Sequence, residues 1–154
     1  MTNEEEKIKE IIKTLLEKMG IGGEVDAYET AENLQFTIRT NEAGLLIGEG
    51  GQNLIALNHI AKRIGEKVLG EREFPYSVDV NEYQKLKAEE LKDLARMSAQ
   101  RVRFFKKEIT LDPMTSYERR IVHAALTTYP DIITESQGEE PNRSVVIKPF
   151  IPEV

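Results

Sequence analysis

The sequence contains no cysteine, no tryptophan and only two histidines. Without cysteine the chain has no disulfide framework, no thiol nucleophile and no thiolate ligand for a metal. Two histidines alone are too few for an ordinary zinc centre. We therefore expect a protein that holds neither a metal ion nor another cofactor.

Long hydrophobic runs are also missing from this sequence. No stretch approaches the roughly 20 apolar residues that cross a bilayer as a helix. Residues 1–20 lack both the basic start and the continuous apolar core of a secretory signal. These two absences predict a cytoplasmic protein that does not insert into a membrane.

Positive charge is scarce overall but concentrated in one part of the chain. The 21 Lys and Arg residues are outnumbered by 27 Asp and Glu residues, which argues against a uniformly basic nucleic-acid binder. Residues 82–126, however, carry 10 basic and 7 acidic side chains, and residues 96–107 carry five cations and no acid. A local basic face is therefore available on an acidic molecule.

The chain of 154 residues, 40% hydrophobic and 31% charged, has the composition of one ordinary globular domain or two small ones. Hydrophobic periodicity and turn residues divide it into alternating helices and strands. The pattern predicts helices at about 4–19, 44–47, 52–65, 81–107 and 115–127, and strands at about 25–29, 34–38, 76–80, 108–111, 132–135 and 144–148.

A glycine-rich turn, Gly48-Glu49-Gly50-Gly51, separates two of the predicted helices. Glycine lets backbone approach a phosphate closely, and amides that open a helix attract anions. A helical corner that needs positive φ angles is the structural alternative. Lys62, further along the second helix, supplies some positive charge, but Glu49 places a carboxylate in the turn. That carboxylate favours a second use of this half, in pairing with a protein partner.

The order of elements around this turn resembles a KH domain of the prokaryotic type, over residues 1–81. In KH domains the GxxG loop lies against the backbone of about four nucleotides. The resemblance implies that Gly48, Glu49, Gly50 and Gly51 contact single-stranded nucleic acid.

The second half, residues 82–154, contains an Arg-x-x-x-His pattern at Arg119 and His123, with Arg120 beside it. Residues four apart on a helix share a face. Helical spacing that assigns Ile121 and Ala125 to the core puts Arg119, Arg120 and His123 on the face away from it. An arginine there can fork onto a phosphate, and an imidazole can donate to phosphate or stack on a base.

This segment, with the Gly138-Glu139-Glu140-Pro141-Asn142-Arg143 loop, resembles the R-three-H domain, which is named for its Arg-x-x-x-His. The order KH then R-three-H resembles the bacterial Jag (SpoIIIJ-associated) family over residues 1–150, without a counterpart of its N-terminal Jag domain. The fold expected is α+β: two small α/β sandwich domains joined by a long helix. The resemblance makes Arg119 and His123 the signature pair and Arg143 a further contact.

Membership of that family implies binding of single-stranded RNA, with single-stranded DNA as the other ligand, and a regulatory role linked to cell elongation and envelope growth. It also implies a small KH-domain protein as partner, or a homodimer formed through the KH half. The alternative is a protein-interaction adaptor that binds RNA weakly or not at all. No nucleophile elbow, P-loop or zinc-protease motif is present, so we do not expect an enzyme.

Two adjacent phenylalanines end the long predicted helix. Phe105 continues the apolar stripe that includes Leu91, Leu94 and Val102, which predicts a core position. Phe104 lies on another face, where packing against the second domain is the favoured role and stacking on a base is the alternative. A Gly-containing turn is more usual in the family at this point.

Overall fold

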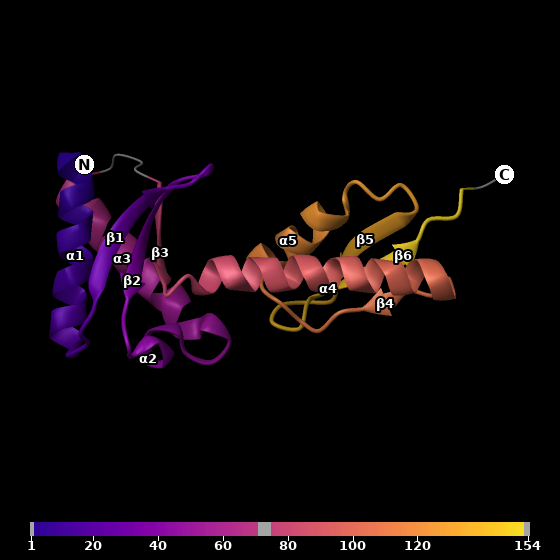
Figure 1. The fold of residues 1–154 in the computed structure, drawn as a ribbon, viewed down its shortest axis with the longest axis horizontal. Coiled ribbons are helices and arrows are strands. Elements are labelled where there is room, and N and C mark those ends of the chain that lie inside the picture. Colours follow the sequence, from indigo (N-terminus) through magenta and orange to yellow (C-terminus); the bar gives the residue numbers. More distant parts are fainter. Residues whose placement is uncertain (1, 71–74, 153–154) are drawn as a thin grey trace. The chain divides into compact units, whose positions relative to one another are not determined.

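The computed structural model describes residues 2–70 and 75–152. The chain divides into two compact units, Met1–Gln84 and Lys85–Val154, called here the first and second units. Each combines helices with one small sheet (Figure 1). The predicted α+β class with two small sheet-and-helix domains is therefore confirmed.

The first unit has a three-stranded sheet in the order β1-β2-β3, in which β1 and β2 are antiparallel and β2 and β3 are parallel. Its elements follow the predicted order: α1 (Asn3–Met19), β1 (Glu24–Glu29), β2 (Leu34–Arg39), α2 (Ala43–Ile47), a single 3₁₀ turn η1 (Glu49–Gly51), α3 (Gln52–Leu69) and β3 (Tyr76–Val80).

Helices α1 and α3 contact each other and cover one face of this sheet. Helix α1 begins with a capping box between Thr2 and Glu5 and ends at Gly20, whose left-handed φ of 70° stops the helix. Buried residues spaced three or four apart on both helices meet the inward-facing strand positions in one core, which includes Ile8, Ile12, Leu16, Phe36, Ile38, Leu54, Leu57 and Val78.

The long helix α4 (Tyr83–Phe105) is shorter than predicted at both ends. Asn81 and Glu82 have φ angles of 49° and 60°, so the helix cannot start at Asn81. Lys106 has a φ of 56°, which ends the helix before the two lysines. Backbone reversals at non-glycine residues therefore set both boundaries, and hydrophobic periodicity carries no signal for them.

The second unit packs α4 and α5 (Ser116–Leu126) on an antiparallel sheet in the order β4-β6-β5. The strands are β4 (Ile109–Thr110), β5 (Ile132–Gln137) and β6 (Ser144–Pro149). A capping box between Thr115 and Glu118 starts α5. The core is built from small and branched side chains of these elements, among them Ala95, Ala99, Val102, Val122, Leu126, Val145 and Ile147.

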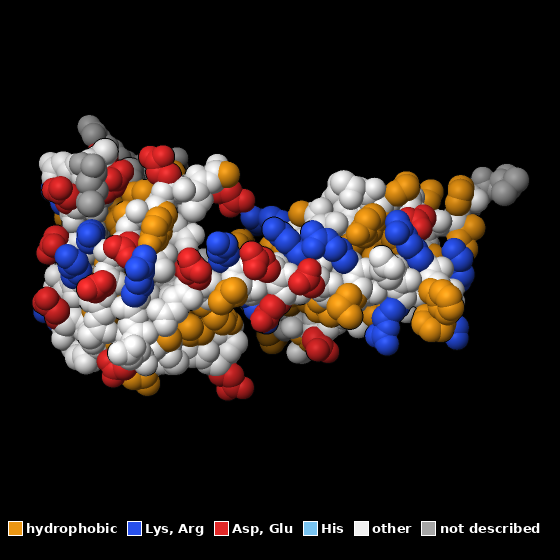
Figure 2. Space-filling model, in the orientation of Figure 1, with side chains coloured by type: hydrophobic (Ala, Val, Ile, Leu, Met, Phe, Trp, Pro, Cys, Tyr) orange, Lys and Arg blue, Asp and Glu red, His pale blue; other side chains and the backbone are white. Residues whose placement is uncertain are grey.

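The two phenylalanines at the end of α4 lie outside this core. Phe104 is 81% exposed and Phe105 is 63% exposed, so neither the predicted core position nor the favoured packing role is correct. Val102 is the last buried residue of α4, and the final turn extends beyond the core. Figure 2 shows hydrophobic side chains at the surface there, next to Lys and Arg side chains.

Candidate nucleic-acid interface

The glycine turn between α2 and α3 requires glycine at its first position. Gly48 has φ 71° and ψ 176°, a backbone conformation that is essentially restricted to glycine. A Cβ atom there would lie 2.6 Å from the side chain of Asn53. That side chain crosses the turn and donates from Nδ2 to the Leu45 carbonyl over 2.8 Å. The turn is therefore a fixed corner held by one glycine and one asparagine.

The remaining turn residues offer less to an anion than the sequence suggests. The Gly51 amide donates to the Gly48 carbonyl over 3.2 Å, and the Gln52 amide donates to the Glu49 carbonyl, so these two amides already have acceptors. The Glu49 side chain is exposed. Lys62 is exposed on α3 and has no ion-pair partner among residues 2–70 and 75–152. Among the described residues, the charge of this predicted cation is therefore free.

Arg119 is buried, which overturns the prediction that it lies on the face away from the core. Arg119 is 7% exposed and lies on the same face of α5 as the buried Val122 and Leu126. One guanidinium nitrogen donates to the Met114 carbonyl and another donates to a Glu140 carboxylate oxygen, each over 2.7 Å. The core face of α5 is thus centred on Arg119, Val122 and Leu126. A satisfied guanidinium can lie on that face, which the hydrophobic pattern does not reveal.

His123 is half-buried, and both of its ring nitrogens have partners on β5. Nδ1 lies 2.7 Å from the Thr134 hydroxyl and Nε2 lies 2.8 Å from the Ser136 hydroxyl. In the neutral ring one nitrogen donates and the other accepts, so two hydroxyl groups satisfy both. The histidine therefore holds α5 against β5.

Arg143 and Arg120 have opposite roles in this structure. The Arg143 guanidinium donates to the backbone carbonyls of Gly138 and Ser136, over 2.7 and 3.2 Å, and so closes the loop between β5 and β6. Arg120 is exposed, and none of the described residues forms an ion pair with it. Of the four predicted residues in the second unit, Arg120 is the one whose charge is free to meet a phosphate.

The surroundings of His123 predict that acid destabilises the second unit. Burial lowers the pKa of His123 below its ordinary value of 6.5, and the nearby positive charge of Arg119 lowers it further. A ring whose pKa falls on folding contributes stability that is present above the unfolded pKa and is lost as the pH falls through the folded pKa. The carboxyls of Asp131 and Glu135 have pKa values below their ordinary values, so they stay charged between about pH 5 and 7.5.

We therefore expect the melting temperature to fall as the pH is lowered from about 7.5 to about 5, and His123→Gln to flatten that dependence. Circular dichroism melts of both proteins across this range provide the measurement. Equal pH dependence in the two proteins would show that another group causes the acid sensitivity.

Arg103 is a third arginine with fixed partners, which the sequence did not predict. Arg103 near the end of α4 donates from Nε and Nη2 to the two carboxylate oxygens of Asp131, each over 2.7 Å. Its guanidinium also lies 4.5 Å from the centre of the Tyr129 ring. In the sequence Arg103 is one of the five cations of residues 96–107, and nothing in its spacing identifies a partner 28 residues away.

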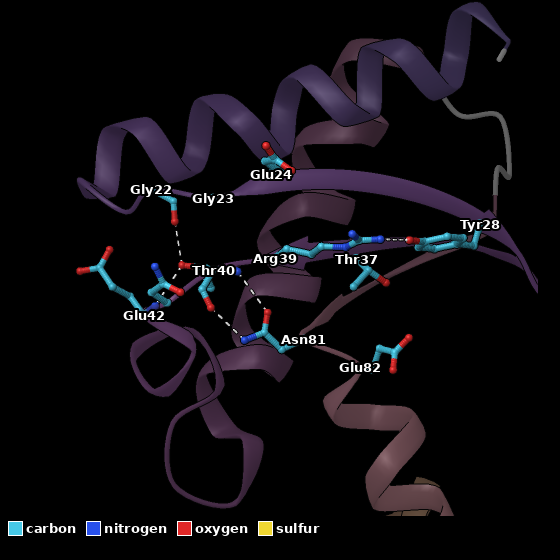
Figure 3. Close-up of a pocket in the computed structure, with 11 residues that line it drawn as sticks. Gly22, Gly23, Glu24, Tyr28, Thr37, Arg39, Thr40, Glu42, Asn81 and Glu82 are labelled. Carbon is cyan, nitrogen blue, oxygen red and sulfur yellow. Dashed lines mark hydrogen bonds between the residues drawn. The ribbon is translucent and has the colours of Figure 1, made fainter.

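A polar hollow in the first unit is a poor match to a polyanion. Glycines from the loop before β1 and polar side chains from β1, β2 and the loops after β2 and β3 line it (Figure 3). Arg39 points along the hollow to the Tyr28 hydroxyl and also pairs with Asp26 at 3.1 Å. Three carboxylates, those of Glu24, Glu42 and Glu82, surround this single arginine, and their charge repels phosphate.

Two further features concern metals and membranes. Within the part of the chain that the structure describes, no three His, Asp or Glu side chains converge as metal ligands would. In that same part, no helix combines the length and the apolar character needed to span a membrane.

The fold and the two sites define a class of protein in which a KH domain precedes an R-three-H domain. The sequence matches the KH domain family over residues 7–113 and the R-three-H domain family over residues 89–149. It is 33% identical to RNA-binding protein KhpB of Clostridium symbiosum over 129 residues, and these residues cover 84% of this chain and 58% of that protein. It is also 33% identical to RNA-binding protein KhpB of Bacillus subtilis (strain 168) over 144 residues, which cover 92% of this chain and 69% of that protein.

A further relative is RNA-binding protein KhpB of Lactiplantibacillus plantarum, 31% identical over 133 residues that cover 86% of this chain and 41% of that protein. The chain belongs to the KhpB family, also called the Jag family. It spans 41% to 69% of the length of these three relatives. The predicted resemblance to the Jag family is confirmed.

Proposed function

We propose that this protein binds single-stranded RNA, with single-stranded DNA as a second ligand of the same chemistry. The observation that carries the proposal is the presence in one chain of two domain types, KH and R-three-H, with relatives that are named RNA-binding proteins. KH domains bind unpaired nucleotides rather than a duplex.

The contacts that support this proposal differ between the predicted residues. Arg120 and Lys62 are exposed and unpaired within the described part of the chain, so their charges are available to phosphates. Arg119 reaches a phosphate only by giving up the Glu140 carboxylate. We therefore assign direct phosphate contact to Arg120 and Lys62, and support of the surface to Arg119, His123 and Arg143.

The test is a titration of fluorescently labelled single-stranded RNA at several salt concentrations. We expect saturable binding that weakens steeply as the salt concentration rises, because Lys and Arg side chains that bind phosphates displace counterions from the RNA. Arg120→Ala and Lys62→Ala should each reduce the slope of log affinity against log salt by about one. Lys13→Ala is the matched control, because Lys13 already lies 3.9 Å from a Glu10 carboxylate oxygen. Absence of saturable binding at low salt would contradict the proposal.

Membership of the Jag family also supports a proposal about the cellular role of this protein. We propose that the bound RNA is regulated in the bacterial cytoplasm, in a process linked to cell elongation and envelope growth, and that the protein itself is not an enzyme. Sequencing of RNA crosslinked to the protein in cells would test this role. Crosslinks confined to abundant ribosomal and transfer RNA would contradict it.

An adaptor role is the second candidate, and the exposed Glu49 carboxylate in the glycine turn favours it. A carboxylate repels phosphate at the point where a KH loop approaches RNA. In this role the KH half pairs with a small KH-domain protein or with a second copy of the chain. Light scattering that shows such a complex, from a protein that binds no RNA at low salt, would support the adaptor over the RNA binder.

A further inference from the structure

We propose that Phe104 and Phe105, with Arg101, Lys106 and Lys107 around them, form a base-stacking site for single-stranded nucleic acid at the C-terminal end of α4. The proposal rests on the RNA-binding function proposed above and adds a site to it. Neither the core of the second unit nor the group of Arg119, His123 and Arg143, called here the Arg119 cluster, uses these five side chains.

The two rings form an exposed edge-to-face pair. Their centres are 4.9 Å apart and their planes are inclined by 82°. In this arrangement the edge of one ring lies against a flat face of the other, so the pair itself covers only one of its four flat faces. Phe104 is the most exposed large hydrophobic residue of the described chain, at 81%. An open aromatic face is the group on which unpaired bases stack.

The helix end that carries the pair is held in place. Arg103, one residue before Phe104, is fixed by the bidentate contact with Asp131 and by the Tyr129 ring. The backbone carbonyl of Asp131 in turn accepts a hydrogen bond over 2.9 Å from the amide of Phe150, which follows β6. A rigid platform loses little conformational entropy when a base stacks on it.

The charges around the rings select the occupant. Arg101, Lys106 and Lys107 are exposed, and no acidic side chain of the described residues lies within ion-pair distance of them. Glu108, the next acid along the chain, faces Lys148 at 4.0 Å. Figure 2 shows Lys and Arg side chains close to hydrophobic side chains at this end of α4. Phosphates that alternate with flat bases match this arrangement, whereas an apolar protein segment leaves the three cations unpaired.

This site is separate from the Arg119 cluster. Arg119 and Arg143 lie by the closed loop of the β5–β6 hairpin, since they contact Glu140 and Gly138. Arg103 contacts Asp131, which precedes the first residue of β5 at the open end. The six residues of β5 separate the two ends by about 17 Å at about 3.3 Å per residue. An RNA of about 12 nucleotides, about 40 Å long with stacked bases, is long enough to span this separation.

The absence of tryptophan from this chain provides a direct test. Phe104→Trp places a single fluorescent indole at the proposed stacking position, and a base that stacks on it should quench its emission. We expect saturable quenching by a single-stranded RNA of about 12 nucleotides and none by the same sequence as a duplex, whose bases are already stacked. Leu94→Trp is the matched control: Leu94 is also exposed on α4, ten residues or about 15 Å earlier.

A second variant separates stacking from simple hydrophobic contact. Phe104→Leu keeps an apolar side chain without a π face, and we expect RNA affinity to fall about tenfold, while Phe104→Tyr keeps it. Because the side chain is exposed, all three Phe104 variants should fold, which thermal melts will verify.

The outcomes distinguish this site from the proposed function. If labelled RNA binds the unsubstituted protein but Phe104→Trp is not quenched and Phe104→Leu binds normally, the stacking site is wrong and RNA binding stands. If the unsubstituted protein binds no RNA, both are wrong. Emission that changes with protein concentration alone would assign the phenylalanines to contact between two copies of the chain and overturn the stacking site.

Discussion

Replacing Arg119 with alanine should lower the free energy of unfolding of the second unit by about 2–3 kcal/mol. The substitution leaves the Met114 carbonyl without its donor, and a hydrogen bond to a charged group contributes about 1.5–3 kcal/mol. The contact with Glu140 adds little, because that carboxylate is 60% exposed and water screens the pair to about 0–1 kcal/mol. Urea denaturation followed by circular dichroism measures the loss.

The neighbouring residue is a matched control for this prediction. Arg120 is exposed, so Arg120→Ala should change the unfolding free energy by less than about 0.5 kcal/mol. Arg119→Lys should recover only part of the loss, because one ammonium group cannot reproduce the fork that reaches both Met114 and Glu140. Equal denaturation midpoints for Arg119→Ala and the unsubstituted protein, together with weaker RNA binding, would show that Arg119 acts on RNA directly and not through the fold.

Replacing Gly48 with alanine should destabilise the first unit by about 2–4 kcal/mol. A residue with a Cβ atom in the backbone conformation of Gly48 costs about 1–3 kcal/mol. The new Cβ atom would also displace Asn53, which loses its hydrogen bond to Leu45, for about 1 kcal/mol more. Thermal and urea unfolding of the variant provide the measurement.

Gly50 in the same turn is the comparison that isolates the effect. Its φ of 61° is left-handed, but a Cβ atom added there meets no other atom within 4 Å. Gly50→Ala should therefore cost about 1 kcal/mol, the ordinary penalty of the left-handed region. If both variants lost the same stability, the contact between Gly48 and Asn53 would not be the cause.

Much of the fold could be predicted because its signals are local. The apolar spacing of Ile8, Ile12 and Leu16 specifies α1, and strict alternation around Phe36 specifies β2. Glycines at 48, 50 and 51 marked the corner between α2 and α3, and all three have positive φ. Each of these features depends on residues a few positions apart, so one sequence suffices to recognise it.

The orientation of α5 and the fate of two aromatic residues could not be predicted in this way. Ile121 and Ala125 offered an apolar face as good as the true one, and a buried guanidinium at Arg119 looks polar in any periodicity count. Phe105 was expected in the helix core and Phe104 in a packing contact, because the pattern does not show where the sheet beneath α4 ends. Both errors arise from contacts between distant segments.

The sequence by itself determined two α+β domains, their order, the glycine turn and the Arg-x-x-x-His pattern, because short-range spacing and composition encode these. Only the tertiary structure decided which cations are free. Arg119, Arg143 and Arg103 are held by Glu140, by backbone carbonyls and by Asp131, while Arg120 and Lys62 remain exposed. A charge can meet a phosphate only where folding has not already given it a partner, and that depends on distances between remote residues.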